Sequence, residues 1–166
     1  MQTILLSTLL AVSLVGTLNA QETTGSAAEQ VKKEIINLET EKLPSILQKG
    51  SVAADWFNRI DADGIVHVRS DGSLVTKAQA LAKIRSGEQK LRSNKQYGHQ
   101  VHVYGDGGNG TTAVVSYFDF ATVELSGSVN THHGVVTDVF VKLDGSWRRV
   151  VHQVTPIAHT DSRPKP

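Results

Sequence analysis

The first half of the chain shows a helical pattern of apolar residues. They recur every three or four positions through 27–49, which predicts a helix. Pro44 removes one backbone donor and disfavours helix before it, so we expect a kink or break there. Gly50 ends this segment and Ser51 is a good N-cap, which predicts a short second helix over 52–59.

The middle of the chain alternates turn signals with short elements. Residues 61–64 read as a turn, and residues 65–69 alternate as a short strand. Thr76 followed by Gln79 has the spacing of a capping box, so a third helix should begin there. That helix should end near Gly87.

The second half is dominated by alternating apolar positions, which predict long strands over 96–104, 111–125, 131–143 and 146–155. Asp144-Gly145 joins the last two as a tight hairpin, because a type I′ turn needs positive φ. Residues 126–130 are expected to form a loop. The predicted fold class is α+β: three N-terminal helices packed on a curled, mainly antiparallel sheet. A pocket between the helices and the curled sheet is expected.

The N-terminal segment has the features of an export signal. Residues 1–20 are mostly apolar and end at Ala20, so we predict a signal peptide, with a buried N-terminal helix as the alternative. The apolar run is too short to predict a membrane span. A flexible linker (21–28), one domain (29–156) and a disordered tail (157–166) should follow. The expected location is periplasmic or extracellular.

Composition excludes several classes of chemistry. The chain has no cysteine, so it has no disulfide, zinc-thiolate site or cysteine nucleophile. The formal net charge is +1 and no basic run is longer than two residues, which argues against nucleic-acid binding. No dinucleotide fingerprint or nucleophile elbow occurs, and no cofactor is predicted.

A family resemblance rests on a series of motifs. In order, the chain carries two helices, ADGIVHV, SDGSLVTKAQAL, VHVYGD, TTAVVSYFDF and TDVFVKLDGSWRRVVHQVTP. This order resembles the nuclear transport factor 2-like superfamily, and most closely its SnoaL-like branch, over residues 29–156. The resemblance implies a cone-shaped fold with a pocket and, commonly, a homodimer through the outer sheet face. Its members include ketosteroid isomerase-like enzymes, polyketide cyclases, dehydratases and non-catalytic binding modules.

Asp138 is the first candidate for catalysis. A carboxylate in the middle of an apolar strand is costly unless it is paired. In an apolar pocket its pKa would rise, making it a general acid or base near neutral pH. The alternative is a structural ion pair with Arg149. A two-residue turn places Asp138, Arg149 and Gln153 on one face of the hairpin and His152 on the other.

Asp119 and Tyr117 are the other two catalytic candidates. They share a face of the strand predicted over 111–125. Asp119 poses the same question as Asp138. The Tyr117 hydroxyl could stabilise an oxyanion, or it could simply be packed in the core with its hydrogen bond satisfied.

Four further residues are predicted to contact a ligand: Trp56, His67, His152 and Gln153. A core role is the alternative for Trp56, His67 and His152. No pair of histidines has metal-ligand spacing on one element, and no metal is predicted. A site assembled from His67, His152 and a loop histidine stays open.

Two classes of function follow. In the first, the pocket binds a small molecule. Asp138 or Asp119 then transfers a proton while Tyr117 polarises an oxygen, and the molecule is isomerised, cyclised or dehydrated. In the second, the domain is a non-catalytic dimeric interaction module and the acids are structural. We favour small-molecule binding and leave catalysis as a hypothesis, because fold alone does not choose between them.

Overall fold

A computed structural model describes residues 22–40, 50–105 and 111–157. The predicted signal peptide, the break at Pro44 and residues 158–166 of the tail lie outside this part. The described residues form three helices: α1 (Ser26–Thr40), α3 (Gly50–Ile60) and α4 (Lys77–Arg85). They also form six strands: β1 (Asp61–Val68), β2 (Leu74–Val75), β3 (Gln89–Tyr104), β4 (Thr112–Leu125), β5 (Ser128–Leu143) and β6 (Ser146–Pro156).

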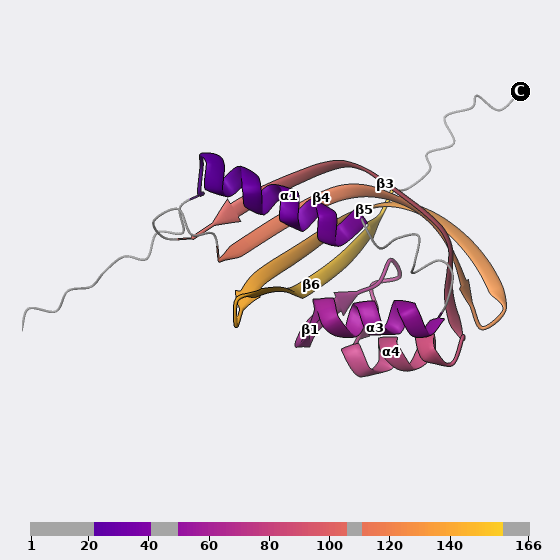
Figure 1. The fold of residues 1–166 in the computed structure, drawn as a ribbon. Coiled ribbons are helices and arrows are strands. Elements are labelled where there is room, and N and C mark those ends of the chain that lie inside the picture. Colours follow the sequence, from indigo (N-terminus) through magenta and orange to yellow (C-terminus); the bar gives the residue numbers. More distant parts are fainter. Residues whose placement is uncertain (1–21, 41–49, 106–110, 158–166) are drawn as a thin grey trace, which may run out of the picture.

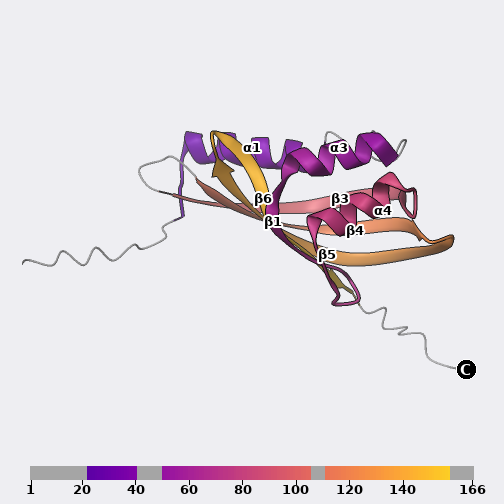
Figure 2. The same ribbon diagram turned by 90° about the horizontal axis from the view of Figure 1, so that it is seen from below.

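The strands make one mixed, open sheet in the order β2-β1-β6-β5-β4-β3. Neighbours pair antiparallel except β1 and β6, which run parallel. The long strands curl, and the helices lie along the side toward which they curl (Figures 1 and 2). This arrangement is the predicted α+β class, and α4 follows β1 and β2, as the short strand predicted before the third helix indicated.

The core fills the space between the helices and the sheet. Helices α1 and α3 supply residues such as Ile35 and Trp56, and the strands supply Val103, Val115 and Phe140. Inward and outward positions alternate along β4, as expected for a sheet with one buried face. None of the described helices is both long and apolar enough to cross a membrane.

Local signals in the sequence are confirmed at two places. Thr76 caps α4, and its side chain and that of Gln79 form the reciprocal capping box. Asp144 and Gly145 have φ values of 49° and 76°, as a type I′ turn requires. Residues 126 and 127 form a second turn of this kind, so β5 begins at Ser128 where a longer loop was predicted.

Three element boundaries differ from the prediction. β1 begins at Asp61, within the predicted turn 61–64, because the Asp61 side chain is bonded inside the protein and needs no exposed turn. β3 begins at Gln89, so the chain that reads as strand from Lys90 onward and the long strand predicted over 96–104 form one element. Glu22 forms an isolated bridge with Tyr104 of β3, and α1 begins at Ser26, within the segment predicted as a flexible linker.

A β-bulge in β6 corrects the predicted faces of the last hairpin. Val139 pairs with Val151 while Phe140 pairs with Arg149, so Val150 has no partner of its own. The extra residue reverses the alternation after Arg149. His152 therefore pairs with Asp138 and lies on the inner side, and Gln153 turns outward.

Candidate functional site

A buried guanidinium lies at the centre of the inner face. Arg149, on β6, is 2% exposed. Its Nε donates to Asp61 Oδ1 at 2.9 Å and its Nη1 donates to Asp138 Oδ2 at 3.4 Å. The third carboxyl group, on Glu39, places Oε1 3.9 Å from Nη1. Elements β6, β1, β5 and α1 thus meet at one buried cation, which Asp61 and Asp138 compensate.

Aromatic rings cover the same guanidinium. The Arg149 Cζ atom lies 5.7 Å from the ring centre of Trp56 and 5.6 Å from that of Phe57. The two rings pack edge to face, with their centres 4.8 Å apart. This contact provides cation–π stabilisation and joins α3 to the charged cluster.

Two histidines extend the cluster toward the solvent. His67 Nε2 lies 3.0 Å from Asp61 Oδ2, and His152 Nδ1 lies 2.7 Å from Asp138 Oδ1. Arg149 Nη1 is farther from His152 Nδ1, at 3.3 Å. We therefore assign the His152 proton to Nδ1, donating to Asp138, which leaves the Nε2 lone pair available. The two imidazole rings are 5.3 Å apart.

The Tyr117 hydroxyl lies between two carboxyl groups. It is 3.2 Å from Glu39 Oε2 and 3.2 Å from Asp138 Oδ2. One hydroxyl hydrogen cannot fully serve both oxygens, so the two carboxyl groups compete for the Tyr117 donor. Burial and the neighbouring Asp138 charge raise the pKa of Glu39 well above its ordinary value, which favours its protonated form.

The pKa of Asp138 is lowered and that of Tyr117 is raised, so Asp138 stays ionised and Tyr117 keeps its proton. Burial opposes ionisation of Asp138, but the charges of His152 and Arg149 outweigh burial and lower its pKa. Burial and the Asp138 and Glu39 charges raise the pKa of Tyr117 well above its ordinary value. The ion pair with Arg149, the alternative interpretation of Asp138, is thus present in the structure.

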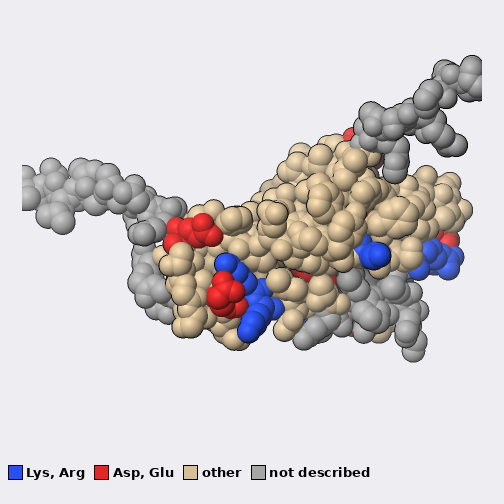
Figure 3. Space-filling view, turned by 90° about the horizontal axis from the view of Figure 1, so that it is seen from above, with Lys and Arg blue, Asp and Glu red and all other residues tan. Residues whose placement is uncertain are grey.

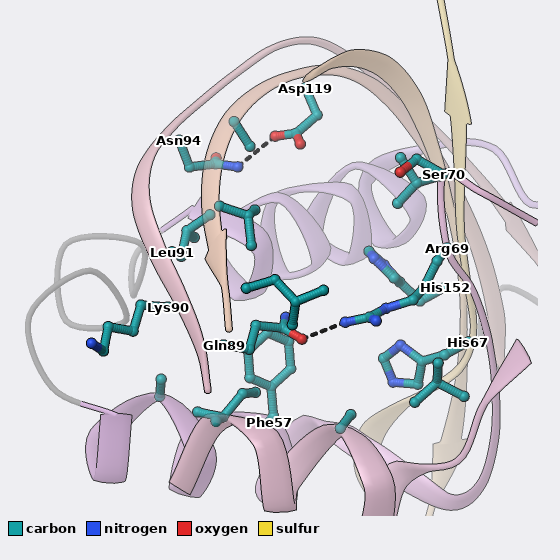
Figure 4. Close-up of a pocket in the computed structure, with 18 of the residues that line it drawn as sticks. Phe57, His67, Arg69, Ser70, Gln89, Lys90, Leu91, Asn94, Asp119 and His152 are labelled. Atoms are coloured by element: carbon teal, nitrogen blue, oxygen red, sulfur yellow. Dashed lines mark hydrogen bonds between the residues drawn. The ribbon is translucent and has the colours of Figure 1, made fainter. Parts of the chain in front are cut away.

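A cavity of about 1020 Å³ opens above this cluster, between the helices and the concave sheet. Figure 4 shows Phe57, His67 and His152 near one end of it and the Asp119–Asn94 pair near the other. Asn94 donates to Asp119 Oδ1 at 2.5 Å, and His132 Nε2 lies 3.2 Å from Asp119 Oδ2. Between them, Arg69 after β1 donates to Gln89 at the start of β3, across the cavity (Figure 4).

The structure separates the predicted site residues into three groups. Five of them line the cavity: Trp56, His67, Tyr117, Asp119 and His152. Asp138 is fully buried beneath His152 and does not reach the cavity surface. Gln153 is exposed on the other side of the sheet, where its amide bonds to Thr155.

Sequence reasoning missed two members of the charged cluster. Glu39 belongs to the helical pattern of 27–49 and reads as one more surface charge, and Asp61 reads as a turn residue. The available signal was indirect. If Arg149 is buried, its guanidinium needs more hydrogen-bond acceptors than its own hairpin supplies, which indicates acidic partners from other elements. Within the described residues, no three histidine or acidic side chains are arranged to hold a metal ion.

Comparison with solved structures identifies the architecture. An NTF2-like protein from Cytophaga hutchinsonii ATCC 33406 superposes with a TM-score of 0.65 at 21% identity, over 76% of this chain and 98% of its own. An NTF2-like protein of unknown function in nutrient uptake, from Rhodospirillum rubrum ATCC 11170, gives 0.64 at 21% identity, over 75% and 98%. This chain has the NTF2-like fold.

The association domain of CaMKII from C. elegans has the same architecture, with a TM-score of 0.56 at 16% identity over 78% of this chain and 99% of its own. No family model and no curated protein matches the chain. The comparisons therefore establish the fold, as predicted from the sequence, and the site has to be interpreted from its own geometry.

Proposed function

We propose that this NTF2-like domain binds a small organic molecule in the cavity and that His152 transfers a proton to or from it. The observation that carries the proposal is the Asp138–His152 pair, whose 2.7 Å contact fixes the imidazole while the ring lines the cavity. A carboxylate behind an imidazole holds its tautomer and stabilises the imidazolium when a proton arrives.

The roles follow from the contacts. His152 is the group that touches the ligand. Asp138 acts through His152 as a positioning residue, because it is fully buried and already bonded to Arg149. His67, held by Asp61, is a second imidazole on the same wall and can return a proton that His152 removes.

Such a pair suits reactions in which a proton leaves one atom of a substrate and joins another. Isomerisation, cyclisation and dehydration next to a carbonyl group are of this kind. Asp119 is the remaining candidate of the sequence prediction. It lies at the other end of the cavity with Asn94 and His132, and it fits a ligand-positioning role there.

The test is a small-molecule screen by thermal shift, with a metabolite pull-down, on wild type, His152→Gln and Asp138→Asn. A compound that binds the cavity raises the melting temperature by mass action, and both substitutions should change that shift. His102→Gln is the matched control, because His102 is an exposed imidazole paired with Glu22. A broad screen without any cavity ligand would remove the proposal.

Positioning by Asp138 needs its own readout. The ring nitrogen shifts of His152 in a ¹⁵N spectrum should show the proton on Nδ1 in wild type and a mixture of tautomers in Asp138→Asn. The same tautomer in both proteins would show that Asp138 serves stability alone.

A second proposal concerns assembly. Tyr97, Phe118, Phe120 and His133 form an outer aromatic patch on the convex side of β3, β4 and β5, with Tyr97 stacked on Phe118 at 5.2 Å. Phe118 and Phe120 are 40% and 45% exposed. In the view of Figure 3, charged side chains gather toward the ends of the molecule and are sparse across its middle. We propose that a second copy of the chain covers this patch.

The neighbouring CaMKII structure, an association domain by name, supports assembly through this fold. Sedimentation at micromolar concentration should give a dimer for wild type and a monomer for Phe118→Glu. Leu74→Glu is the control, because Leu74 is an equally apolar exposed residue on β2, away from the patch. A wild-type monomer at these concentrations contradicts the proposal.

A further inference from the structure

At its inner end, next to Arg149, the cavity has two deeply buried polar atoms without a hydrogen-bond partner among the described residues. They are the indole nitrogen Nε1 of Trp56 and the carboxyl oxygen Oε1 of Glu39. Trp56 is 6% exposed and Glu39 is 2% exposed, and both side chains line the cavity. Leaving such groups unpaired is unfavourable, so the pair requires an explanation.

Both side chains lie against the same guanidinium. Glu39 Oε1 is 3.9 Å from Arg149 Nη1, too far for a hydrogen bond, and the Trp56 ring centre is 5.7 Å from Arg149 Cζ. Arg149 Nη2 also lacks a well-directed hydrogen bond, although it lies 2.9 Å from Asp61 Oδ1, the oxygen that already accepts from Nε. The ion pair explains Nη2, and nothing in the described chain explains the other two atoms.

We infer that this inner end is a subsite for a hydroxyl group on an uncharged part of the ligand. The inference rests on the proposed binding of a small molecule in the cavity. Trp56 can only donate a hydrogen bond, and Glu39 Oε1 can accept one, because the contact with Tyr117 is made by the other carboxyl oxygen, Oε2. A hydroxyl group is the simple ligand group that accepts from the first and donates to the second.

The charge of the cluster selects against a carboxylate at this position. Arg149 is compensated by Asp61 and Asp138, so its positive charge is not available to an added anion. Asp138 has its pKa lowered and stays ionised, and its negative charge lies next to the same wall. An anionic group placed here would be repelled and would lose its hydration without gaining a free cation.

The experiment compares three probes with the same aromatic body: 2-naphthol, 2-methylnaphthalene and 2-naphthoate. Wild type should bind 2-naphthol about tenfold more tightly than either of the others, by titration calorimetry. Trp56→Phe keeps an aromatic ring and loses only the hydrogen-bond donor. The affinity for 2-naphthol should therefore fall about fivefold to tenfold, while the affinity for 2-methylnaphthalene should change less than about twofold.

Trp147→Phe is the matched control. Trp147 is also a buried core tryptophan, but its Nε1 already donates to Glu34 Oε2 at 3.2 Å and it does not line the cavity. This variant should leave all three affinities unchanged. The chain has two tryptophans, so a ¹H–¹⁵N spectrum of wild type has two indole signals. The Trp56 signal should move with 2-naphthol far more than with 2-methylnaphthalene, and the Trp147 signal should stay.

The outcomes separate the two proposals. Equal affinity for 2-naphthol and 2-methylnaphthalene, or an equal loss of both in Trp56→Phe, overturns the hydroxyl subsite and leaves small-molecule binding intact. Preference for 2-naphthoate overturns the charge argument and with it the subsite. Binding of none of the three probes counts against both the subsite and the proposed function.

Discussion

Arg149 keeps its charge in a place that water does not reach, and its neighbours make that possible. Asp61 and Asp138 supply ionised carboxylates, Trp56 and Phe57 cover the guanidinium, and Glu39 adds a third carboxyl group. Removing one partner from such a cluster lowers the free energy of unfolding more than replacing the whole cluster with apolar residues, because the remaining charges are left buried without compensation. Each member is therefore sensitive to substitution.

Arg149→Met should destabilise the protein by about 3–5 kcal/mol, because it leaves Asp61 and Asp138 buried without their cation. Urea unfolding measures the change. Arg148→Met is the control: it removes the adjacent arginine, which is only partly buried, and should shift the free energy of unfolding by less than about 0.5 kcal/mol. Equal stability of Arg149→Met and wild type would show that the cluster contributes no net stabilisation.

Stability should also depend on pH through Glu39. Its pKa is raised in the folded protein from an unfolded value of 4.5, by burial and by Asp138. Above pH 4.5 the unfolded chain has released a proton that the folded protein keeps, so the free energy of unfolding falls as pH rises toward the folded pKa. The slope from this group is at most about 1.4 kcal/mol per pH unit.

Glu39→Gln has no titrating group at this position, so its free energy of unfolding should not show the decrease with rising pH that Glu39 causes in wild type. Urea unfolding between pH 4.5 and 8 checks the difference between the two proteins. Glu29→Gln is the control, since Glu29 is an exposed acid on the same helix paired with Lys32. The same pH profile for Glu39→Gln and wild type would contradict a protonated Glu39.

At the scale of elements, some features follow from short-range chemistry and others do not. The capping box of α4 and the Asp144-Gly145 turn could be predicted, because each depends on residues within four positions of one another. The bulge at Val150 could not, because nothing in VVHQV marks which residue goes unpaired. That single bulge decides whether His152 or Gln153 faces the cavity, so the faces predicted for these two residues were wrong.

The contact of α3 with α4 gives a test at this scale. A Cβ on Gly50, the first residue of α3, would lie 2.8 Å from the backbone oxygen of Ile84 in α4. Gly50→Ala should therefore push the helices apart and cost about 1–3 kcal/mol in thermal or urea unfolding. At Gly64 a Cβ meets nothing within 4 Å, so Gly64→Ala should be close to neutral. Similar stability of both variants would contradict the close approach.

For the whole molecule, the N-terminal boundary connects the predicted signal peptide to the fold. Thr23 is 8% exposed, and its N–H donates to Val103 O at 2.7 Å. We predict that mass spectrometry of the protein from its host finds a mature N-terminus near Gln21, which keeps this contact. A protein that begins at Ser26 should be about 1 kcal/mol less stable than one that begins at Gln21, through the lost hydrogen bond. An intact Met1 in soluble protein would contradict the cleavage.

The parallel pairing of β1 with β6 has a consequence for how the chain folds. Asp61 meets Arg149 across 88 positions of sequence, and β1 has no neighbour other than β2 until β6 arrives. Closing such long loops is slow compared with forming local hairpins. During synthesis, Asp61 and Glu39 therefore stay hydrated until the last strand has left the ribosome, and only then can the acids be buried. A domain whose sheet is completed by its final strand stays incompletely folded until its synthesis is nearly finished, and this order of events is compatible with the export predicted from the sequence.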